Sequence, residues 1–278
     1  MDNHFEKVID TIRDEFTHSA RKVVNKTWQS IAAPQATYEL LNYSVRMVLP
    51  TEDLDYYREN ILPNLPWADD HFLKERVSGD PINPGTEWRN WPYAASADKH
   101  RQPGAEDPEF SHSYAERYWP KFAGLGNGGV LMSDHPSNIR RGIRFPYGDL
   151  DDLVDVLVTD PTTRQAYLPV WFPEDLGAAT IGQRVPCTLG YHFIVRDNAM
   201  HVVYYIRSCD YVRHFRDDVY MTIRLLLWVL EQCRLADPNG QWDEVSPGTF
   251  TMHITSLHIF ESDRKFVIRS APGGASAV

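Results

Sequence analysis

Apolar residues recur along this chain with helical spacing in several segments. Over residues 5–16 they return every three or four positions and form one stripe, which predicts an amphipathic helix near the start of the chain. Residues 219–235 are apolar over most of a helical circumference, so we expect a buried core helix there. Shorter helices are expected over residues 53–62, 71–77 and 150–158.

Other segments have the pattern of strands. Two apolar runs, residues 185–195 and 200–206, flank the polar turn Arg196, Asp197, Asn198 and Ala199, and this arrangement predicts a β-hairpin. The order of the elements mixes helices with antiparallel strands and lacks regular βαβ units, so it predicts an α+β fold. Further strands are expected over residues 36–49, 166–170 and 248–260.

The length and composition favour one domain. The chain has 278 residues, 42% of them hydrophobic, which is enough to bury a sizeable core. No linker divides it, so we expect a single domain over residues 1–278. Segments near residues 80–110 and 123–145 are predicted to be irregular loops, which are usually functional when they are this long. Residues 270–278 should form a short flexible tail.

The charge and the cysteine content restrict the partners. A net charge of -10 is the opposite of the basic surface typical of nucleic-acid-binding proteins, so any phosphate should be bound by a few arginines. Three cysteines do not suggest a disulfide framework and fit a reducing compartment. The start lacks a secretory leader, and no apolar run is long enough to span a membrane. We therefore expect a cytoplasmic protein that binds no nucleic acid, membrane or metal.

One pair of residues, a cysteine and an arginine, suggests a nucleophilic site. Cys187 begins one strand of the predicted hairpin and Arg207 ends the other, so strand pairing should bring them together. A guanidinium stabilises a nearby thiolate, which is the form of cysteine that attacks carbon. The alternatives are that Cys187 is a small buried hydrophobic residue and that Arg207 forms a surface ion pair with Asp210.

The segment around this pair, PCTLGYHFIVRDNAMHVVYYIRSCDYVRHFRDDVYM, resembles the nucleophile strand and phosphate-binding segment of the thymidylate synthase family. Residues 114–119 (YAERYW) and 256–258 (SLH) also match that family. The resemblance implies a thymidylate synthase-like fold with a mixed, mostly antiparallel sheet, flanking helices and a sheet-mediated homodimer. It also implies that Cys187 adds to C6 of a pyrimidine nucleotide and that His258 contacts this nucleotide.

The resemblance also implies a phosphate site. Arg207 and Ser208 would hold the 5′-phosphate, a task that suits a bidentate guanidinium. Arg164 lies in a segment similar to the one that donates phosphate-binding arginines to the neighbouring subunit, although Gln165 replaces the second arginine. Lys26 is the candidate for the family's N-terminal phosphate-binding arginine.

Asp218 stands where uracil-using members of the family have Asn. A carboxyl group accepts hydrogen bonds well but donates poorly when ionised, so it suits the amino group that cytosine displays. Thr188 replaces a usual His, and residues 215–218 resemble the corresponding segment of the cytidylate hydroxymethylases. Without the resemblance, Asp218 would be interpreted as an exposed acid at a helix N-terminus.

Family members take their one-carbon unit from 5,10-methylenetetrahydrofolate. By resemblance Asp210 would contact its pterin ring and Trp88 and Trp91 would lie beside it, unless these tryptophans only anchor their loop. Tyr114 would help to remove the C5 proton. Glu75 is our candidate for the active-site glutamate, with a solvated helix acid as the alternative.

Two products are compatible with this chemistry. Hydride from the folate gives a methyl group, whereas water gives a hydroxymethyl group. Only twenty residues follow His258, and the family's long closing segment is missing, so we expect water to enter. The terminal Val278 resembles a synthase ending and keeps the methyl product open. The prediction is folate-dependent C5 hydroxymethylation of CMP or dCMP, with a pyrimidine nucleotide methyltransferase or a catalytically silent nucleotide-binding paralogue as alternatives.

Two departures from the family pattern bear on the substrates. Arg213 and His214 replace an apolar residue and a glycine, which indicates that folate docks differently. Phe260 replaces a Tyr that hydrogen-bonds the sugar, so ribose and deoxyribose both remain open.

Overall fold

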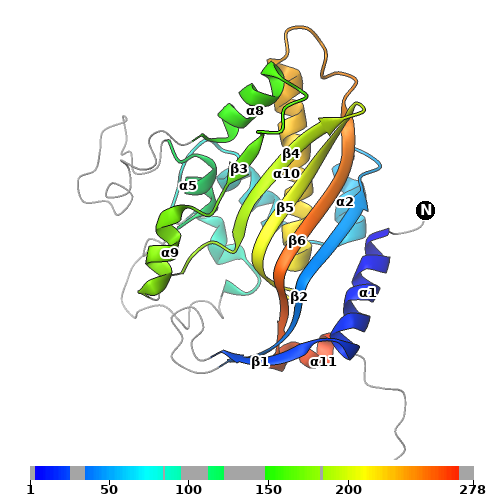
Figure 1. Cartoon of the computed structure of the whole chain (residues 1–278), viewed down its shortest axis with the longest axis vertical. Coiled ribbons are helices and arrows are strands. Elements are labelled where there is room, and N and C mark those ends of the chain that lie inside the picture. Colours follow the sequence, from blue (N-terminus) through cyan, green and yellow to red (C-terminus); the bar gives the residue numbers. More distant parts are fainter. Residues whose placement is uncertain are drawn as a thin grey trace, which may run out of the picture.

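The computed structural model describes residues 4–25, 35–83, 85–94, 112–121, 148–181 and 184–268. In these ranges six strands form one sheet in the order β1–β2–β6–β5–β4–β3, and α10 passes behind the strands in the view of Figure 1. The strands are β1 (Arg21–Asn25), β2 (Gln35–Val48), β3 (Tyr167–Pro169), β4 (Thr188–Arg196), β5 (Ala199–Asp210) and β6 (Ser246–Phe260). The helices are α1 (His4–His18), α2 (Leu54–Ile61), α3 (Trp67–His71), η1 (Phe72–Arg76), η2 (Glu87–Asn90), α5 (Tyr114–Tyr118), α8 (Leu150–Thr159), α9 (Pro173–Thr180), α10 (Phe215–Ala236), η3 (Glu261–Asp263) and α11 (Arg264–Val267).

The predicted hairpin is confirmed. Strands β4 and β5 pair antiparallel, with Val195 opposite Met200, and Asp197 and Asn198 both adopt positive φ in the turn between them. This two-residue turn matches the twist of the strands, and Asp and Asn tolerate the left-handed conformation that it needs. The hairpin therefore fixes the register that sets Cys187 against the end of β5.

Strand β5 is followed by α10, which returns the chain so that β6 pairs parallel to β5. In this register Ser208 lies opposite Ser256, and Asp210 lies opposite His258. A parallel pair requires a long crossover, which the 22-residue helix supplies. The sheet is therefore mixed and mostly antiparallel, as expected, and it contains one βαβ unit that the sequence pattern did not indicate.

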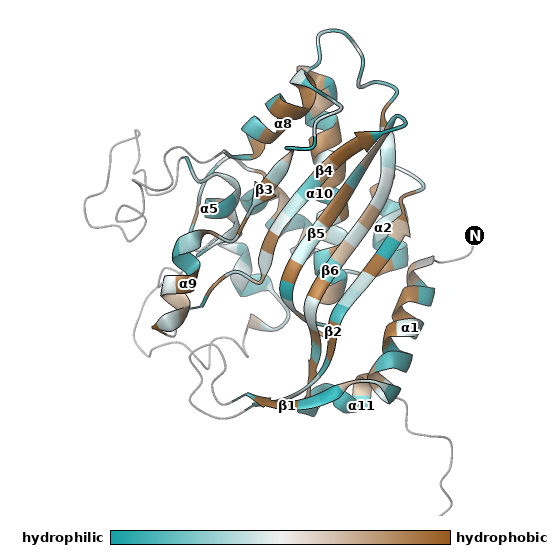
Figure 2. Ribbon diagram, viewed as in Figure 1, coloured by the Kyte–Doolittle hydropathy of each residue, from teal (hydrophilic) through white to brown (hydrophobic). Residues whose placement is uncertain are grey.

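Helix α10 forms the centre of the core. Its residues Leu225, Leu226, Val229 and Leu230 are fully buried, and the helix packs against β5, β6 and α8. Bands of apolar and polar residues alternate along the strands in Figure 2, because successive side chains of a strand point to opposite faces. One core cluster extends from α1 to α11.

Most of the predicted elements are present, with shifts at their ends. The helix expected over residues 71–77 is divided between α3 and the π-helix η1, and α10 begins at Phe215, four residues earlier than expected. The sequence pattern missed β1, η2, α5, α9, η3 and α11. The predicted loop at 123–145 and the predicted tail at 270–278 lie entirely outside the described residues. None of the helices in the described ranges is both long and apolar enough to cross a membrane.

Candidate active site

Cys187 lies directly before β4, at the end of the sheet where β5 finishes. Its side chain is half-buried, and the backbone N–H of Arg207 donates to the Cys187 carbonyl at 2.9 Å. Strand pairing therefore brings the two residues together as the sequence predicted.

The guanidinium of Arg207 is held by the backbone. Nε donates to the Pro186 carbonyl at 2.8 Å and Nη2 donates to the Val185 carbonyl at 3.1 Å. The guanidinium also lies over the Trp171 ring, 5.5 Å from its centroid. Asp210 pairs with Arg213 instead, so the expected alternative of an Arg207–Asp210 ion pair is wrong. A guanidinium fixed in this way is preorganised to bind an anion.

The charges around Cys187 act in opposite directions. Burial raises the pKa of the Cys187 thiol, and the Arg207 charge lowers it but compensates only in part. Asp218 and Asp210 raise the pKa further, whereas Arg184 lowers it. The thiol is therefore the resting form, and Arg207 alone does not create a thiolate, contrary to what the sequence suggested.

Asp218 lies in the first turn of α10 and is buried, so the alternative of an exposed helix acid is wrong. Burial raises the pKa of Asp218 to about 7. Arg76 opposes this increase, whereas Asp217 and Asp210 add to it. The Cys209 thiol donates to Oδ2 of Asp218 at 3.6 Å. A carboxyl group with this pKa is present in both charge states at neutral pH.

Three hydroxyl groups form a chain beside this carboxyl group. The Thr188 hydroxyl lies 2.9 Å from the Tyr114 hydroxyl and 2.8 Å from the Tyr204 hydroxyl. Thr188 and Tyr204 are buried, and Cys187 and Asp218 both act electrostatically on Tyr114. The structure thus brings Tyr114, Thr188, Cys187 and Asp218 into one group of neighbouring side chains, which we call the Cys187 pocket.

A second group of side chains lies around Asp210. Oδ1 of Asp210 accepts from the backbone N–H groups of Val212 and Arg213, at 3.0 and 3.1 Å. Burial raises the pKa of Asp210 to about 6. The guanidinium of Arg213 pairs with Asp263 at 2.9 Å and lies 4.6 Å from the centroid of the Phe260 ring.

Aromatic rings continue this group. Trp91 stacks on His214 with ring centroids 4.7 Å apart and also contacts Tyr93 and Trp67. The buried Nε1 of Trp91 has no hydrogen-bond partner among the described residues. Trp88 lies on η2, with the guanidinium of Arg89 5.4 Å from its ring centroid. The structure therefore associates Trp91 with the rings near Asp210.

Both carboxylate oxygens of Asp210 have partners within the protein. Oδ2 lies 3.5 Å from Nη1 of Arg213, and the donors to Oδ1 come from the turn that follows β5. His258, opposite Asp210, is buried, and burial lowers its pKa to about 4. The imidazole is therefore neutral at physiological pH.

Glu75 is buried, so the alternative of a solvated helix acid is wrong. It accepts from His71 at 2.7 Å and from the backbone N–H of Glu87 at 2.7 Å. A Cβ atom at Gly85 would overlap its carboxylate, so glycine makes room for it. Glu75 forms no direct bond to Cys187 or Asp218 in the described structure. Its neighbour Arg76, which the sequence did not single out, lies against Tyr114.

Arg164 lies in the loop before β3, away from Cys187. It is exposed, and its carbonyl accepts from His192. His192 is on β4, five residues after Cys187. This separation corresponds to about 16 Å, so Arg164 does not reach the Cys187 of its own chain. Ser208 is half-buried beside Ser256, and Lys26 lies outside the described residues.

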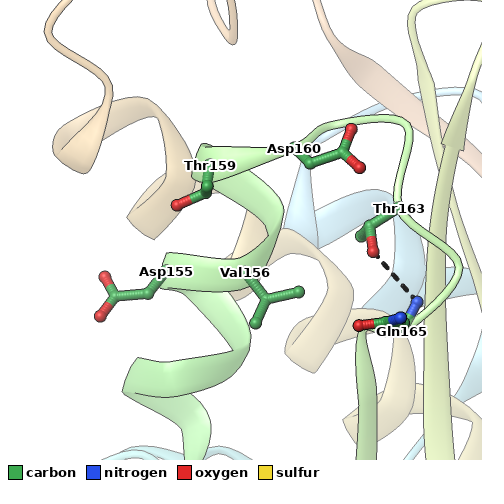
Figure 3. Close-up of a pocket in the computed structure, with 6 residues that line it drawn as sticks. All are labelled: Asp155, Val156, Thr159, Asp160, Thr163 and Gln165. Atoms are coloured by element: carbon green, nitrogen blue, oxygen red, sulfur yellow. Dashed lines mark hydrogen bonds between the residues drawn. The ribbon is translucent and has the colours of Figure 1, made fainter.

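A hollow of about 380 Å³ opens between the end of α8 and the loop that carries Arg164. Figure 3 shows the Thr163 side chain bonded to the Gln165 backbone in this loop. The hollow is lined by Asp155, Val156, Thr159, Asp160, Thr163 and Gln165, and none of these belongs to the Cys187 pocket. In the described part of the chain, no group of three or more His, Cys, Asp or Glu side chains is arranged to hold a metal ion.

Comparison with known proteins identifies the fold and the family. The thymidylate synthase family profile matches residues 67–269. The chain is 28% identical over 149 residues to a thymidylate synthase of Sphingopyxis alaskensis, which covers 53% of this chain and 43% of that protein. It is 26% identical over 161 residues to an assigned thymidylate synthase of Methanococcoides burtonii, covering 57% and 66% of the two chains.

Solved structures share this fold. The thymidylate synthase of T4 phage superposes with a TM-score of 0.60 at 16% identity, covering 96% of this chain and 82% of that one. Thermostable thymidylate synthase A of Bacillus subtilis gives a TM-score of 0.58 at 15% identity, covering 95% and 82%. The matches span about half to two-thirds of the curated relatives. The family profile covers well over half of this sequence, and the chain therefore belongs to the thymidylate synthase family.

Proposed function

We propose that this protein transfers a one-carbon unit to C5 of a cytidine monophosphate, with Cys187 as the nucleophile. The observation that carries the proposal is the buried carboxyl group of Asp218 in the same pocket as Cys187. Addition of the thiolate to C6 would make C5 nucleophilic, and 5,10-methylenetetrahydrofolate would supply the one-carbon unit.

Asp218 supports cytosine as the base. Cytosine displays an amino donor beside the acceptor nitrogen N3, whereas uracil displays a carbonyl acceptor beside an N–H donor. A neutral carboxyl group can accept from the amino group and donate to N3 at the same time. Its ionised form accepts from the amino group but offers nothing to the O4 of uracil. A pKa of about 7 makes both states accessible. The neutral state can also donate to O4 and accept from N3–H of uracil, as an Asn does, so the discrimination against uracil comes from the ionised state, which has no donor for O4.

The phosphate would be bound by two subunits. Arg207 is fixed beside Cys187 by the backbone carbonyls, and Ser208 is adjacent. Arg164 is too far from Cys187 in its own chain, which supports a role in the site of a second copy. The proposed assembly is therefore a homodimer formed through the sheet, with each phosphate bound by residues of both chains.

Mixed dimers test this assembly. Arg164→Ala and Cys187→Ala subunits are each expected to be inactive as homodimers. When the two are unfolded together and refolded, one intact site per heterodimer should restore about a quarter of the wild-type activity. Recovery no greater than the sum of the separate variants would contradict a shared site.

The one-carbon side of the pocket supports a folate. Asp210 would accept from the pterin edge, and Trp91 would provide an aromatic face. Tyr114 would lie next to C5 and help to remove its proton. Glu75 would act indirectly, because its bonds lead through His71 to Arg76. The hydroxymethyl product is supported by the likeness of residues 215–218 to the cytidylate hydroxymethylases, and methyl transfer is the alternative.

Tritium release from [5-³H]CMP and [5-³H]dCMP in the presence of methylenetetrahydrofolate tests the nucleophile. Wild-type protein should release tritium, and Cys187→Ala should reduce the release to background because no adduct can form. The matched control is Cys233→Ala, which removes a buried thiol of α10 outside the pocket and should retain activity. Persistent release from Cys187→Ala would exclude Cys187. The absence of release from wild-type protein with any pyrimidine nucleotide would favour a silent paralogue.

A further inference from the structure

Arg76 is a buried cation at the end of η1. Its guanidinium lies over the Tyr114 ring, 4.1 Å from the centroid. Nε donates to Nε2 of His71 at 3.1 Å, and Nη1 donates to the Tyr118 hydroxyl at 3.4 Å. Three buried or half-buried side chains thus converge on a charge that no pattern in the sequence singles out.

A second buried arginine shows how unusual this arrangement is. Arg117 lies over the Phe172 ring and donates to both carboxylate oxygens of Asp175, at 2.9 and 2.8 Å. A pair of this kind neutralises its own charge. No carboxylate of the described residues forms an ion pair with Arg76, whose charge instead acts electrostatically on Glu75, Asp217 and Asp218. The charge of Arg76 is therefore not neutralised by a single partner, and Asp218 is one of the carboxyl groups on which it acts.

We propose that Arg76 is a positioning residue of the pyrimidine site, which holds Tyr114 in place and supplies the positive charge that acts on Asp218. The proposal deepens the function proposed above and rests on it for the identity of the base. In this role Arg76 acts through Tyr114 and Asp218 and need not contact the reacting carbon.

The stacking explains how Tyr114 is held. The guanidinium covers one face of the ring, while the Thr188 hydroxyl holds the phenol oxygen at 2.9 Å. The attraction between a cation and the face of an aromatic ring is stronger when both are removed from water. The Tyr114 side chain is thereby fixed at two points, its ring face and its hydroxyl.

Arg76 is itself oriented by a line of bonds from Glu75. The Nδ1–H of His71 donates to Glu75 at 2.7 Å, which leaves Nε2 to accept from Arg76. Burial lowers the pKa of His71, so the imidazole is neutral and can accept in this way. The candidate glutamate therefore acts on the pocket through His71 and Arg76.

The groups that act on Asp218 come from several elements. Asp217 of α10 and Asp210 of β5 raise its pKa, burial raises it most, and Arg76 of η1 lowers it. The Cys209 thiol donates to it, and further neighbours are Cys187 before β4, Tyr114 of α5, Tyr191 of β4 and Tyr204 of β5. Arg76 is the cation in this set. Its removal should therefore leave Asp218 protonated to higher pH.

The direct test is a ¹³C NMR titration of the full-length protein with labelled aspartate, in which Asp218→Asn identifies the Asp218 signal. In Arg76→Gln the midpoint of Asp218 should rise by roughly one unit or more, because a favourable charge is lost. In Arg76→Lys, which keeps the charge, the midpoint should stay near the wild-type value. An unchanged midpoint in folded Arg76→Gln would overturn the proposal. This readout needs no turnover, so it still applies if the proposed reaction fails.

Kinetics test the second role and cover the case in which Arg76→Gln does not fold. Arg76→Lys lacks the planar face and should lower kcat for the cytidine nucleotide about tenfold, with little change in KM. An unchanged kcat would contradict the positioning of Tyr114. The matched control is Arg117→Lys, which should lower the melting temperature without shifting the Asp218 midpoint. Wild-type turnover with unaffected Arg76 variants would reject this inference and leave the proposed function intact.

Discussion

The two sides of this pocket are built differently. On the proposed nucleotide side, Cys187, Arg207 and Asp218 are fixed by one hairpin and the first turn of α10, and their positions follow from strand register. On the proposed one-carbon side, His214 stacks on Trp91, and Arg213 pairs with Asp263. The first group resembles the family in residue type and spacing, whereas Arg213 and His214 do not.

This difference suggests which part of the chemistry is retained. Addition of a thiolate to a pyrimidine ring needs a nucleophile, a phosphate anchor and a base-reading group in fixed relative positions, and β-sheet register provides that precision. The proposed one-carbon side would have to admit a second substrate, and its rings and ion pairs come from the residues after η2, the β5–α10 turn, the end of β6 and η3. We infer that base specificity and co-substrate binding can be changed separately.

The largest effect is expected for Asp218→Asn. The amide would donate to O4 of uracil and accept from its N3–H, so preference should move from cytidine to uridine nucleotides by about 100-fold, at roughly 1–3 kcal/mol for each mismatched group. The ratio of kcat/KM values for CMP and UMP, and for dCMP and dUMP, measures it. Asp217→Asn is the matched control, because Asp217 is a buried acid in the same turn of α10 as Asp218 but bonds to Asn64 instead. An equal change of the kcat/KM ratio in Asp217→Asn would show that the effect arises from helix packing.

A smaller effect is expected for His214→Gly on the other side of the pocket. Removal of the ring exposes a face of Trp91, and the KM for methylenetetrahydrofolate should fall several-fold, in line with about 1 kcal/mol for an aromatic contact. The KM for the nucleotide should not change. If the nucleotide KM changed as much as the folate KM, the two sides would not be separable.

The smallest effect concerns pH. In Cys187→Ala, which binds without reacting, CMP affinity should weaken as the pH rises through about 7. Asp218 gains a hydrogen bond to N3 only when it is protonated, so its pKa is higher in the complex than in the free protein. The contribution of this bond to CMP affinity is therefore fully present below the pKa of the free carboxyl group and is lost as the pH rises above it. Calorimetric titrations between pH 6 and 8.5 would measure this trend. The additional substitution Asp218→Asn should remove it, and a trend that persists would show that a group other than Asp218 is responsible.

Much of the nucleotide side could be predicted from the sequence because it depends on local signals. The Asp–Asn turn fixes the β4–β5 register, and this register places Arg207 beside Cys187. The pKa of Cys187 could not be predicted, since burial outweighs Arg207 only in the folded chain. The short helix α5 was missed because five residues carry too little periodicity, although Ser113 and Glu116 form a capping box at its start.

The role of Arg76 depends entirely on tertiary contacts. In sequence it is one basic residue in a short helix and gives no periodic or motif signal. Only the fold brings Tyr114, 38 residues later, and Asp218, on α10, against the same guanidinium. Tyr204 is similar, since its strand position predicts burial but not its bond to Thr188.

The central claim is that Cys187 and Asp218 together direct one-carbon transfer to a cytidine monophosphate. Mass spectrometry of the products from CMP, dCMP, UMP and dUMP, each incubated with wild-type protein and methylenetetrahydrofolate, tests it most directly. We expect the mass of a cytidine nucleotide to increase by one CH₂O unit, without dihydrofolate absorbance. An increase of one CH₂ unit would indicate methyl transfer, and an increase confined to UMP or dUMP would contradict the claim.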